Sequence, residues 1–142
     1  MALERILNTM ASAMSAQSVR MNISASNLAN AASMGSSEDT TYRSKHPVFQ
    51  EVQQKISGLS DADQPIGGVR VTDIIQGDKK LDSHYDPDNP LADKDGRVYL
   101  TDVDPISEMT DMMAASKEYQ ANVEVVNTIK SLLLKTIHAM NN

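Results

Sequence analysis

Glycine and proline are confined to the middle of this 142-residue chain. All six glycines and all five prolines fall between Gly35 and Pro105, and residues 1–34 and 106–142 contain neither. Because both residue types are disfavoured inside helices, this distribution predicts one long helix at each end of the chain and a turn-rich middle.

The N-terminal segment contains eight positions at a heptad spacing, separated by alternating steps of four and three residues. Six of these eight positions are apolar, which predicts one stripe along a helix from about residue 3 to residue 31. The positions are Leu3, Leu7, Met10, Met14, Gln17, Met21, Ser24 and Leu28.

The C-terminal segment repeats the pattern, and eight of its ten positions have side chains that can pack. Asp104 followed by Pro105 is a good helix start, because the carboxylate accepts hydrogen bonds from free amides of the first turn. Residues 106–140 would form a rod of about 50 Å. The ten positions are Met109, Met112, Ser116, Tyr119, Val123, Val126, Lys130, Leu133, Ile137 and Met140, with a second row of Val125, Ile129, Leu132 and Thr136.

These patterns predict a mainly α fold with a small β-unit. The long N- and C-terminal helices are expected to form a coiled-coil pair, with a short antiparallel β and loop insertion between them. The expected boundaries are 1–32 for the first coiled-coil helix, 33–104 for the loop and β-rich middle, and 105–142 for the second helix.

Asparagine amides recur along both predicted helices, at Asn22, Asn27, Asn30, Asn122 and Asn127. Buried amides that bond across a helix interface fix its register. The alternative is that these residues face solvent, and the sequence leaves both interpretations open.

The middle of the chain is acidic and carries strand signals. Between Asp61 and Asp104 there are eleven Asp and five Lys or Arg, whereas the rest of the chain has no net charge. This division predicts that the middle faces solvent and that the ends face protein. Residues 69–75 and 98–100 have strand character, and residues 47–52 have it more weakly.

The sequence offers no convincing chemistry, and we predict no catalytic residue, metal site or cofactor. The chain has no cysteine, and its three histidines share no ligand spacing. An EF-hand interpretation of Asp86, Asp88, Asp93 and Asp95 fails, because Val98 stands where the loop needs its glycine. Solvated turn chemistry is the simpler interpretation of this cluster, with a weak calcium site as the alternative. The net charge of −6 argues against a nucleic-acid-binding protein.

No targeting or membrane-spanning segment is expected. Glu4 and Arg5 stand where a signal peptide would begin its apolar core, and the longest apolar runs are far too short to span a bilayer. The chain is therefore expected to be cytosolic, or exported by a route that cleaves no signal.

Three stretches of the chain resemble one protein family. SASNLANA (residues 24–31) and YQANVEVVNTIKSLLLKTI (residues 119–137) resemble the terminal helices of the bacterial flagellar axial proteins, which form the rod and hook. YDPDNPLADKDGRVYL (residues 85–100), with PISEM (residues 105–109) after it, is similar to the rod proteins of the proximal rod. One departure is the ten residues at 32–41, where many relatives have a short Thr-Pro-Gly-Tyr turn.

The resemblance implies a structural subunit of the proximal rod, built through its terminal helices into a helical drive shaft that transmits torque and encloses the export channel. The implied partners are copies of the chain, other rod proteins, the hook–basal body adaptor and MS-ring proteins. Export through the flagellar type III apparatus and a place in the periplasmic basal body are also implied, without nucleic acid or membrane insertion.

We expect the apolar stripes of the two helices to form the assembly interface, within and between subunits. On the first helix the expected residues are Leu3, Leu7, Met10, Met14, Met21, Asn27, Leu28 and Asn30. On the second they are Met109, Met112, Tyr119, Asn122, Val123, Val126, Asn127, Leu133 and Ile137.

Two other classes of protein stay compatible with the residues. A free-standing helical-hairpin adaptor or export chaperone would bind one client through the same stripes. A calcium-binding or hydrolytic accessory module of the cell envelope would use the acidic loop instead.

Overall fold

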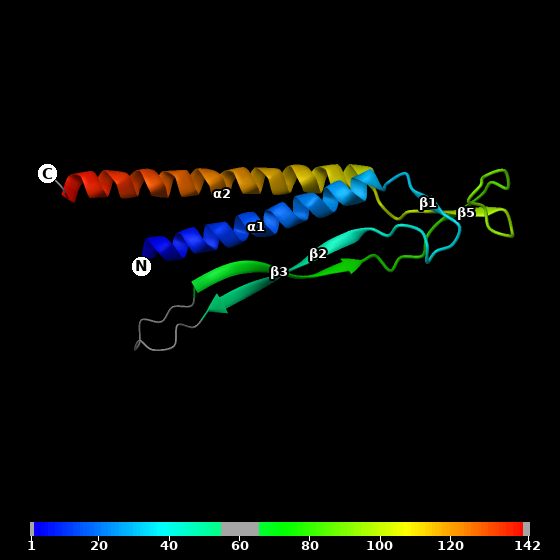
Figure 1. Ribbon diagram of the computed structural model, residues 1–142, viewed down its shortest axis with the longest axis horizontal. Coiled ribbons are helices and arrows are strands. Elements are labelled where there is room, and N and C mark those ends of the chain that lie inside the picture. Colours follow the sequence, from blue (N-terminus) through cyan, green and yellow to red (C-terminus); the bar gives the residue numbers. More distant parts are fainter. Residues whose placement is uncertain (1, 55–65, 141–142) are drawn as a thin grey trace.

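The computed structural model describes residues 2–54 and 66–140 (Figure 1). The ends of the two predicted helical segments, residues 1, 141 and 142, lie outside the described residues, as do Asp61 and Asp63 of the acidic middle and the side chain of Met140. The elements in chain order are α1 (Ala2–Ala29), β1 (Met34–Gly35), β2 (Lys45–Gln54), β3 (Ile66–Gln76), β4 (Ser83–Tyr85), β5 (Arg97–Leu100) and α2 (Pro105–Met140).

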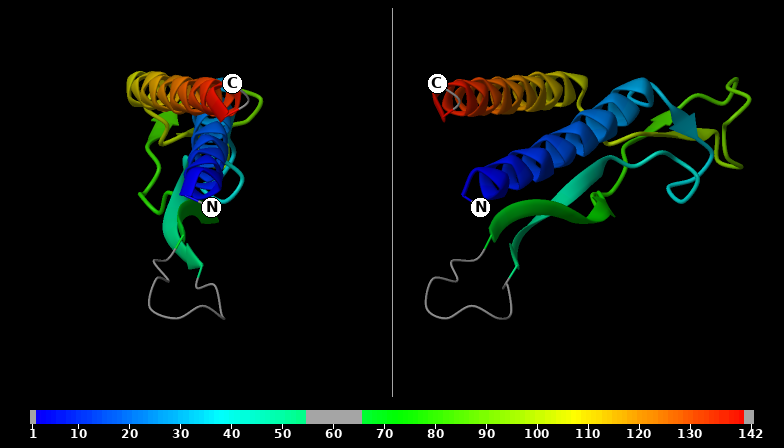
Figure 2. Two further views of the ribbon diagram at one scale, coloured as in Figure 1. Left: turned by 90° about the vertical axis from the view of Figure 1, so that its left-hand side faces the viewer. Right: turned by 60° about the vertical axis from the view of Figure 1, so that its left-hand side comes forward.

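The described part of the molecule is elongated. The two helices run antiparallel along most of its length, the β2–β3 hairpin lies beneath α1, and the small sheet of β1, β5 and β4 forms the far end (Figure 1). Seen after a turn of 60°, α1 and α2 separate steadily from the end at which α1 finishes and α2 begins (Figure 2).

Each sheet is antiparallel. β2 pairs with β3 from Lys45 opposite Gln76 to Gln54 opposite Ile66, with a bulge after Val48. β5 lies between β1 and β4 in the small sheet. These strands confirm the strand character predicted near residues 47–52, 69–75 and 98–100.

α1 crosses the hairpin and satisfies main-chain groups at its free edges. The Thr9 hydroxyl donates to the carbonyl of Gly67 at 2.6 Å, and the amide of Val69 donates to the Ser12 hydroxyl at 3.2 Å. Further along α1, the Asn27 side chain bonds the backbone of Lys45, at the start of β2. Bonds of this kind close strand edges that would otherwise be open to another chain.

The prediction of a mainly α fold with a coiled-coil pair is wrong. β2 and β3 contain 10 and 11 residues, so the middle is a substantial part of an α+β fold built from two antiparallel sheets. The coiled-coil pair is absent because α1 divides its packing between two partners, α2 and the hairpin. A continuous seam needs helices that stay together, whereas these diverge (Figure 2).

The core is small and lies in two places. Along the helices the buried apolar residues are Ala16, Ile23, Ala115 and Ile129, of which two are alanines. At the far sheet, Val98 of β5 is 1% exposed and Leu81 is 4% exposed, and Val103, between β5 and α2, is also buried. With so little apolar volume buried, polar contacts carry an unusual share of the organisation of the fold.

Candidate assembly interface

Asn27 is fully buried and joins three segments at the end where α1 finishes, a contact that we call the three-way junction. The Asn27 amide nitrogen donates to the carbonyl of Lys45 and to a carboxylate oxygen of Glu108, both at 2.8 Å. Its oxygen accepts from the Lys45 amide at 3.0 Å and from the Tyr42 hydroxyl at 2.9 Å. All of its hydrogen-bonding capacity therefore goes into fixing α1 relative to α2, to β2 and to Tyr42 in the loop before β2.

The start of α2 is capped as the sequence predicted. A carboxylate oxygen of Asp104 accepts from the Ile106 amide at 3.1 Å, and the other accepts from the Ser107 hydroxyl at 2.7 Å. The hydrogen bond from Ser107, followed by that from Ile106, lowers the pKa of Asp104 below its ordinary value. The ionised carboxylate is the form that holds the cap.

Two further contacts set the register of the helices. Arg20 forms an ion pair with Asp111 at 2.7 Å, and the Gln17 side chain bonds Glu118. Residues that face each other across these antiparallel helices therefore have numbers that add to about 131–135. Extended along this register, the residues of α2 beyond about 132 run past the described start of α1.

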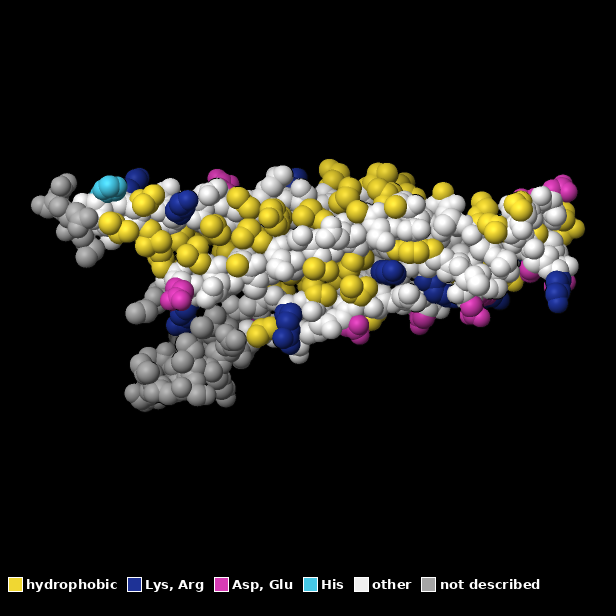
Figure 3. All heavy atoms as spheres, viewed as in Figure 1, with side chains coloured by type: hydrophobic (Ala, Val, Ile, Leu, Met, Phe, Trp, Pro, Cys, Tyr) yellow, Lys and Arg dark blue, Asp and Glu magenta, His cyan; other side chains and the backbone are white. Residues whose placement is uncertain are grey.

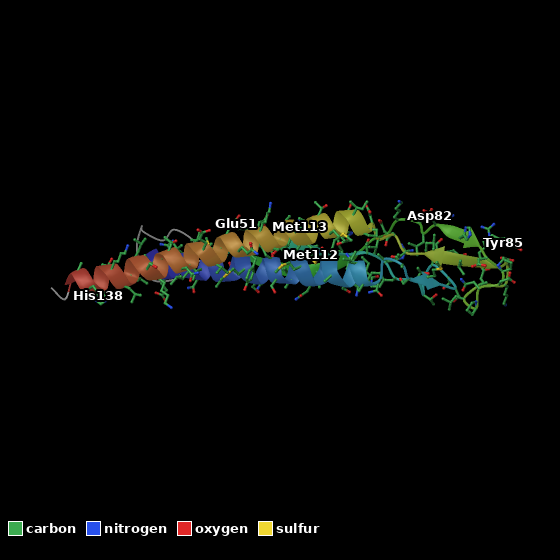
Figure 4. All side chains as sticks on the ribbon, turned by 90° about the horizontal axis from the view of Figure 1, so that it is seen from above. Glu51, Asp82, Tyr85, Met112, Met113 and His138 are labelled. Atoms are coloured by element: carbon green, nitrogen blue, oxygen red, sulfur yellow. The ribbon has the colours of Figure 1, made fainter. Side chains whose placement is uncertain are left out.

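α2 leaves large apolar side chains exposed at both of its ends. Near its C-terminal end, Leu132, Leu133, Leu134 and Ile137 are 39–54% exposed. Near its start, Ile106, Met109 and Met113 are 48–76% exposed. Yellow side chains accordingly gather along α2 in Figure 3, and Tyr85 and His138 mark the two opposite ends of the molecule in Figure 4. Exposed apolar surface on this scale is typical of a protein that binds other proteins.

The structure places the residues of the expected interface in three environments. Asn27 is buried, and its bonds lie within the subunit. The half-buried residues are Leu3, Leu7, Met10, Met14, Met21, Leu28 and Asn30 on α1, with Met112, Tyr119, Asn122 and Val126 on α2. The exposed residues are Met109, Val123, Asn127, Leu133 and Ile137.

A second row on α1 was missed. Thr9, Ser12, Ala16, Ile23 and Asn27 share the side of α1 that meets the hairpin, through the hydroxyl bonds, the buried apolar residues and the amide described above. Steps of three, four and seven connect them, so the heptad spacing was present in the sequence. Asn27 was among the predicted interface residues, but Thr9, Ser12 and Ala16 are polar or small and form no apolar stripe.

Known proteins resemble this chain over nearly its whole length. The chain is 45% identical over 137 residues to the flagellar basal-body rod protein FlgC of Escherichia coli O6:H1, covering 96% of this chain and 97% of that protein. It is 45% identical over 139 residues to FlgC of Salmonella typhimurium, with the same coverage. It is 35% identical over 140 residues to FlgC of Bacillus subtilis, covering 92% of this chain and 93% of that protein. The family model of the flagellar basal body rod FlgEFG protein C-terminal region matches residues 94–138.

The chain belongs to the FlgC family. The resemblance to flagellar rod proteins, inferred from residues 24–31, 85–100, 105–109 and 119–137, is thereby confirmed. FlgC-family membership makes the chain a structural component of the flagellar basal-body rod.

The stretch SASNLANA at residues 24–31, on which part of the resemblance rests, has a physical explanation. It contains Asn27, the buried residue of the three-way junction, and Asn30, whose amide donates to the Ser26 carbonyl at 2.8 Å where α1 ends. The first amide positions the helices, and the second closes a helix terminus.

The polar clusters of the described residues are structural in this FlgC-family chain. The Ser44 hydroxyl donates to Asp102 at 3.1 Å and lies 3.3 Å from the His46 ring, so the serine, and not the imidazole, occupies the middle position. A nucleophilic triad requires the opposite order. In the acidic loop, Asp93 accepts from the amides of Asp95 and Arg97, which is turn chemistry.

Residues 2–54 and 66–140 contain neither a candidate metal site nor a candidate membrane span. No group of three or more His, Asp or Glu side chains there is arranged to hold a metal ion. None of the helices in this part of the chain has the length and apolar character needed to cross a membrane.

Proposed function

We propose that this chain is a subunit of the proximal rod that assembles through its terminal helices into a helical drive shaft. The exposed apolar end of α2 is the observation that carries the proposal. Burying apolar surface contributes about 25 cal/mol per Å². Leu132, Leu133, Leu134 and Ile137 stay exposed in the single chain, so this stabilisation becomes available only when a neighbouring subunit arrives.

In the proposed assembly, the helices of successive subunits enclose the export channel and transmit torque. The partners are other copies of the chain, the remaining rod proteins, the hook–basal body adaptor and MS-ring proteins. The chain reaches the periplasmic basal body through the flagellar type III apparatus without a cleaved signal. It acts as a structural protein and performs no catalysis.

The predicted residues at the C-terminal end of α2, above all Leu133 and Ile137, belong to the contacts between subunits in this proposal, because α2 runs past the described start of α1 there. The half-buried residues on α1, such as Met14, pack within the subunit with one portion of the side chain and expose the other portion to a neighbouring subunit. Asn27 contributes indirectly, because it sets the position from which both helices extend.

Deletion of the gene, followed by electron microscopy of isolated basal bodies, tests this function. We expect cells without the chain to make MS rings that carry no complete rod, and we expect the restored gene to recover rods and swimming. Immunoblots should find the chain in the purified basal bodies. Complete rods in the deletion strain, or a chain present only in the cytosol as an adaptor or chaperone would be, would contradict the proposal.

A further inference from the structure

A groove runs between α1 and the β2–β3 hairpin. Its volume is about 460 Å³, and small residues form much of its surface: Ser12, Ser15 and Ala16 from α1, with Gly67 and Gly68 from β3. A side chain at Gly68 would bring its Cβ to 3.2 Å from the Ser12 hydroxyl, so glycine at this position lets the two elements approach closely. Because these side chains are short, the backbone of another helix can approach the groove closely.

Among the described residues that line the groove, one is charged. Arg70 lines it and is exposed, and its guanidinium forms no hydrogen bond or ion pair with any other residue in the described ranges. A segment that fits this groove therefore needs small or medium apolar side chains and one acidic group.

α2 has a face of this kind. Ala121, Val125, Thr128 and Leu132 follow one another in steps of four, three and four residues, and all four are exposed. Heptad spacing places them in one row along the helix. Within the described ranges α2 packs against α1 alone, so no other element covers this row.

The same part of α2 carries one acid that has no ion-pair partner among the described residues. Glu108 bonds Asn27, Asp111 pairs with Arg20, and Glu118 bonds Gln17, so three of the four acids of α2 are used inside the subunit. The fourth, Glu124, is exposed next to Val125, and its carboxylate contacts no cation of the described residues.

We propose that the groove of one subunit receives residues 121–132 of α2 from a second copy of the chain, with Glu124 of that copy beside Arg70. The lengths agree, because the α1 wall from Asn8 to Val19 and the row from Ala121 to Leu132 each extend roughly 16 Å at a helical rise of about 1.5 Å per residue. The inference rests on the proposed function and names the pair of surfaces that joins two subunits.

The two surfaces differ, so the contact is heterologous. A heterologous contact that does not close into a ring repeats along an open helix of subunits. Each subunit has both a groove and a matching helical row, and one type of contact therefore suffices to add subunit after subunit.

Charge reversal tests the pairing in cells that lack the native gene. Arg70→Glu and Glu124→Lys should each impair swimming and rod assembly, because each puts like charges together at the contact. The chain carrying both changes should recover much of the lost swimming. Arg97→Glu is the matched control: it lies on β5, away from the groove, should leave swimming unchanged, and should not rescue Glu124→Lys. Thermal unfolding of the purified variants should match that of the native chain.

Cross-linking tests the geometry independently, since the chain has no cysteine of its own. Cells that make Val69→Cys and Val125→Cys as separate chains should give disulfide-linked dimers in isolated basal bodies. Val69→Cys with Met113→Cys should not, because Met113 lies outside residues 121–132, about 18 Å along the helix from Val125. The inference is overturned if the double charge reversal stays as defective as the single ones, or if the Met113 pair cross-links equally well. Complete rods without the gene would instead overturn the proposed function.

Discussion

Replacing Asn27 with leucine should remove the three-way junction while preserving the size of the side chain. Leucine has no hydrogen-bonding group, and the site is completely buried. The Lys45 amide, the Lys45 carbonyl and the Glu108 carboxylate would each lose a partner, whereas Tyr42 keeps a contact with Ser26 at 3.3 Å.

The expected loss follows from these three orphaned groups. Each buried group without a partner costs about 1–3 kcal/mol, and burial of the leucine returns about 2 kcal/mol, so the free energy of unfolding should fall by about 4 kcal/mol. A loss of that size is a large part of the stability of a typical domain.

Urea unfolding of the purified chain, followed by circular dichroism, measures the effect. The matched control is Asn22→Leu, the same chemical change at an exposed position of the same helix, which should shift the free energy of unfolding by no more than about 0.5 kcal/mol. A loss below about 1 kcal/mol for Asn27→Leu would refute the reasoning, because it would mean that the junction contributes no more than a surface contact.

Three smaller perturbations follow from the same structure. Asp104→Ala should lower the thermal midpoint of unfolding near neutral pH. Because the pKa of Asp104 is lowered in the folded chain, the stabilisation by this cap should disappear as the pH falls through the pKa of the folded state. Thermal unfolding of both chains across an acid pH series would show this loss. Gly96→Ala should cost about 1–2 kcal/mol in urea unfolding, since residue 96 has a φ of 71° and the added Cβ would lie 2.9 Å from the Tyr85 ring. Arg20→Ala should cost at most about 1 kcal/mol in the same assay, because its ion pair with Asp111 is partly exposed.

Local features were accessible from the sequence because local chemistry determines them. The long helices follow from the exclusion of Gly and Pro, and the start of α2 follows from Asp104 and Pro105. The family could also be inferred, because its motifs are concentrated in stretches that a single sequence displays.

The pairing of the elements was not accessible in the same way. An apolar heptad stripe shows that a helix face packs, but it does not say against what. α1 also packs against the hairpin, through Thr9, Ser12 and Asn27, whose hydroxyl and amide groups bond strand edges that become visible only in three dimensions. Polar contacts of this kind do not appear as an apolar stripe in the sequence. The sequence therefore predicted a coiled-coil pair, whereas α1 packs against both α2 and the hairpin.

Replacing both Leu133 and Ile137 with aspartate gives the most direct test of assembly through the terminal helices. Leu133 and Ile137 are 39% and 51% exposed in the single chain, so their replacement should leave the unfolding of the purified subunit within about 0.5 kcal/mol of the native value. In cells, the same chain should be made but should form no complete rod, and the cells should not swim. Complete rods and normal swimming with both aspartates in place would contradict the account.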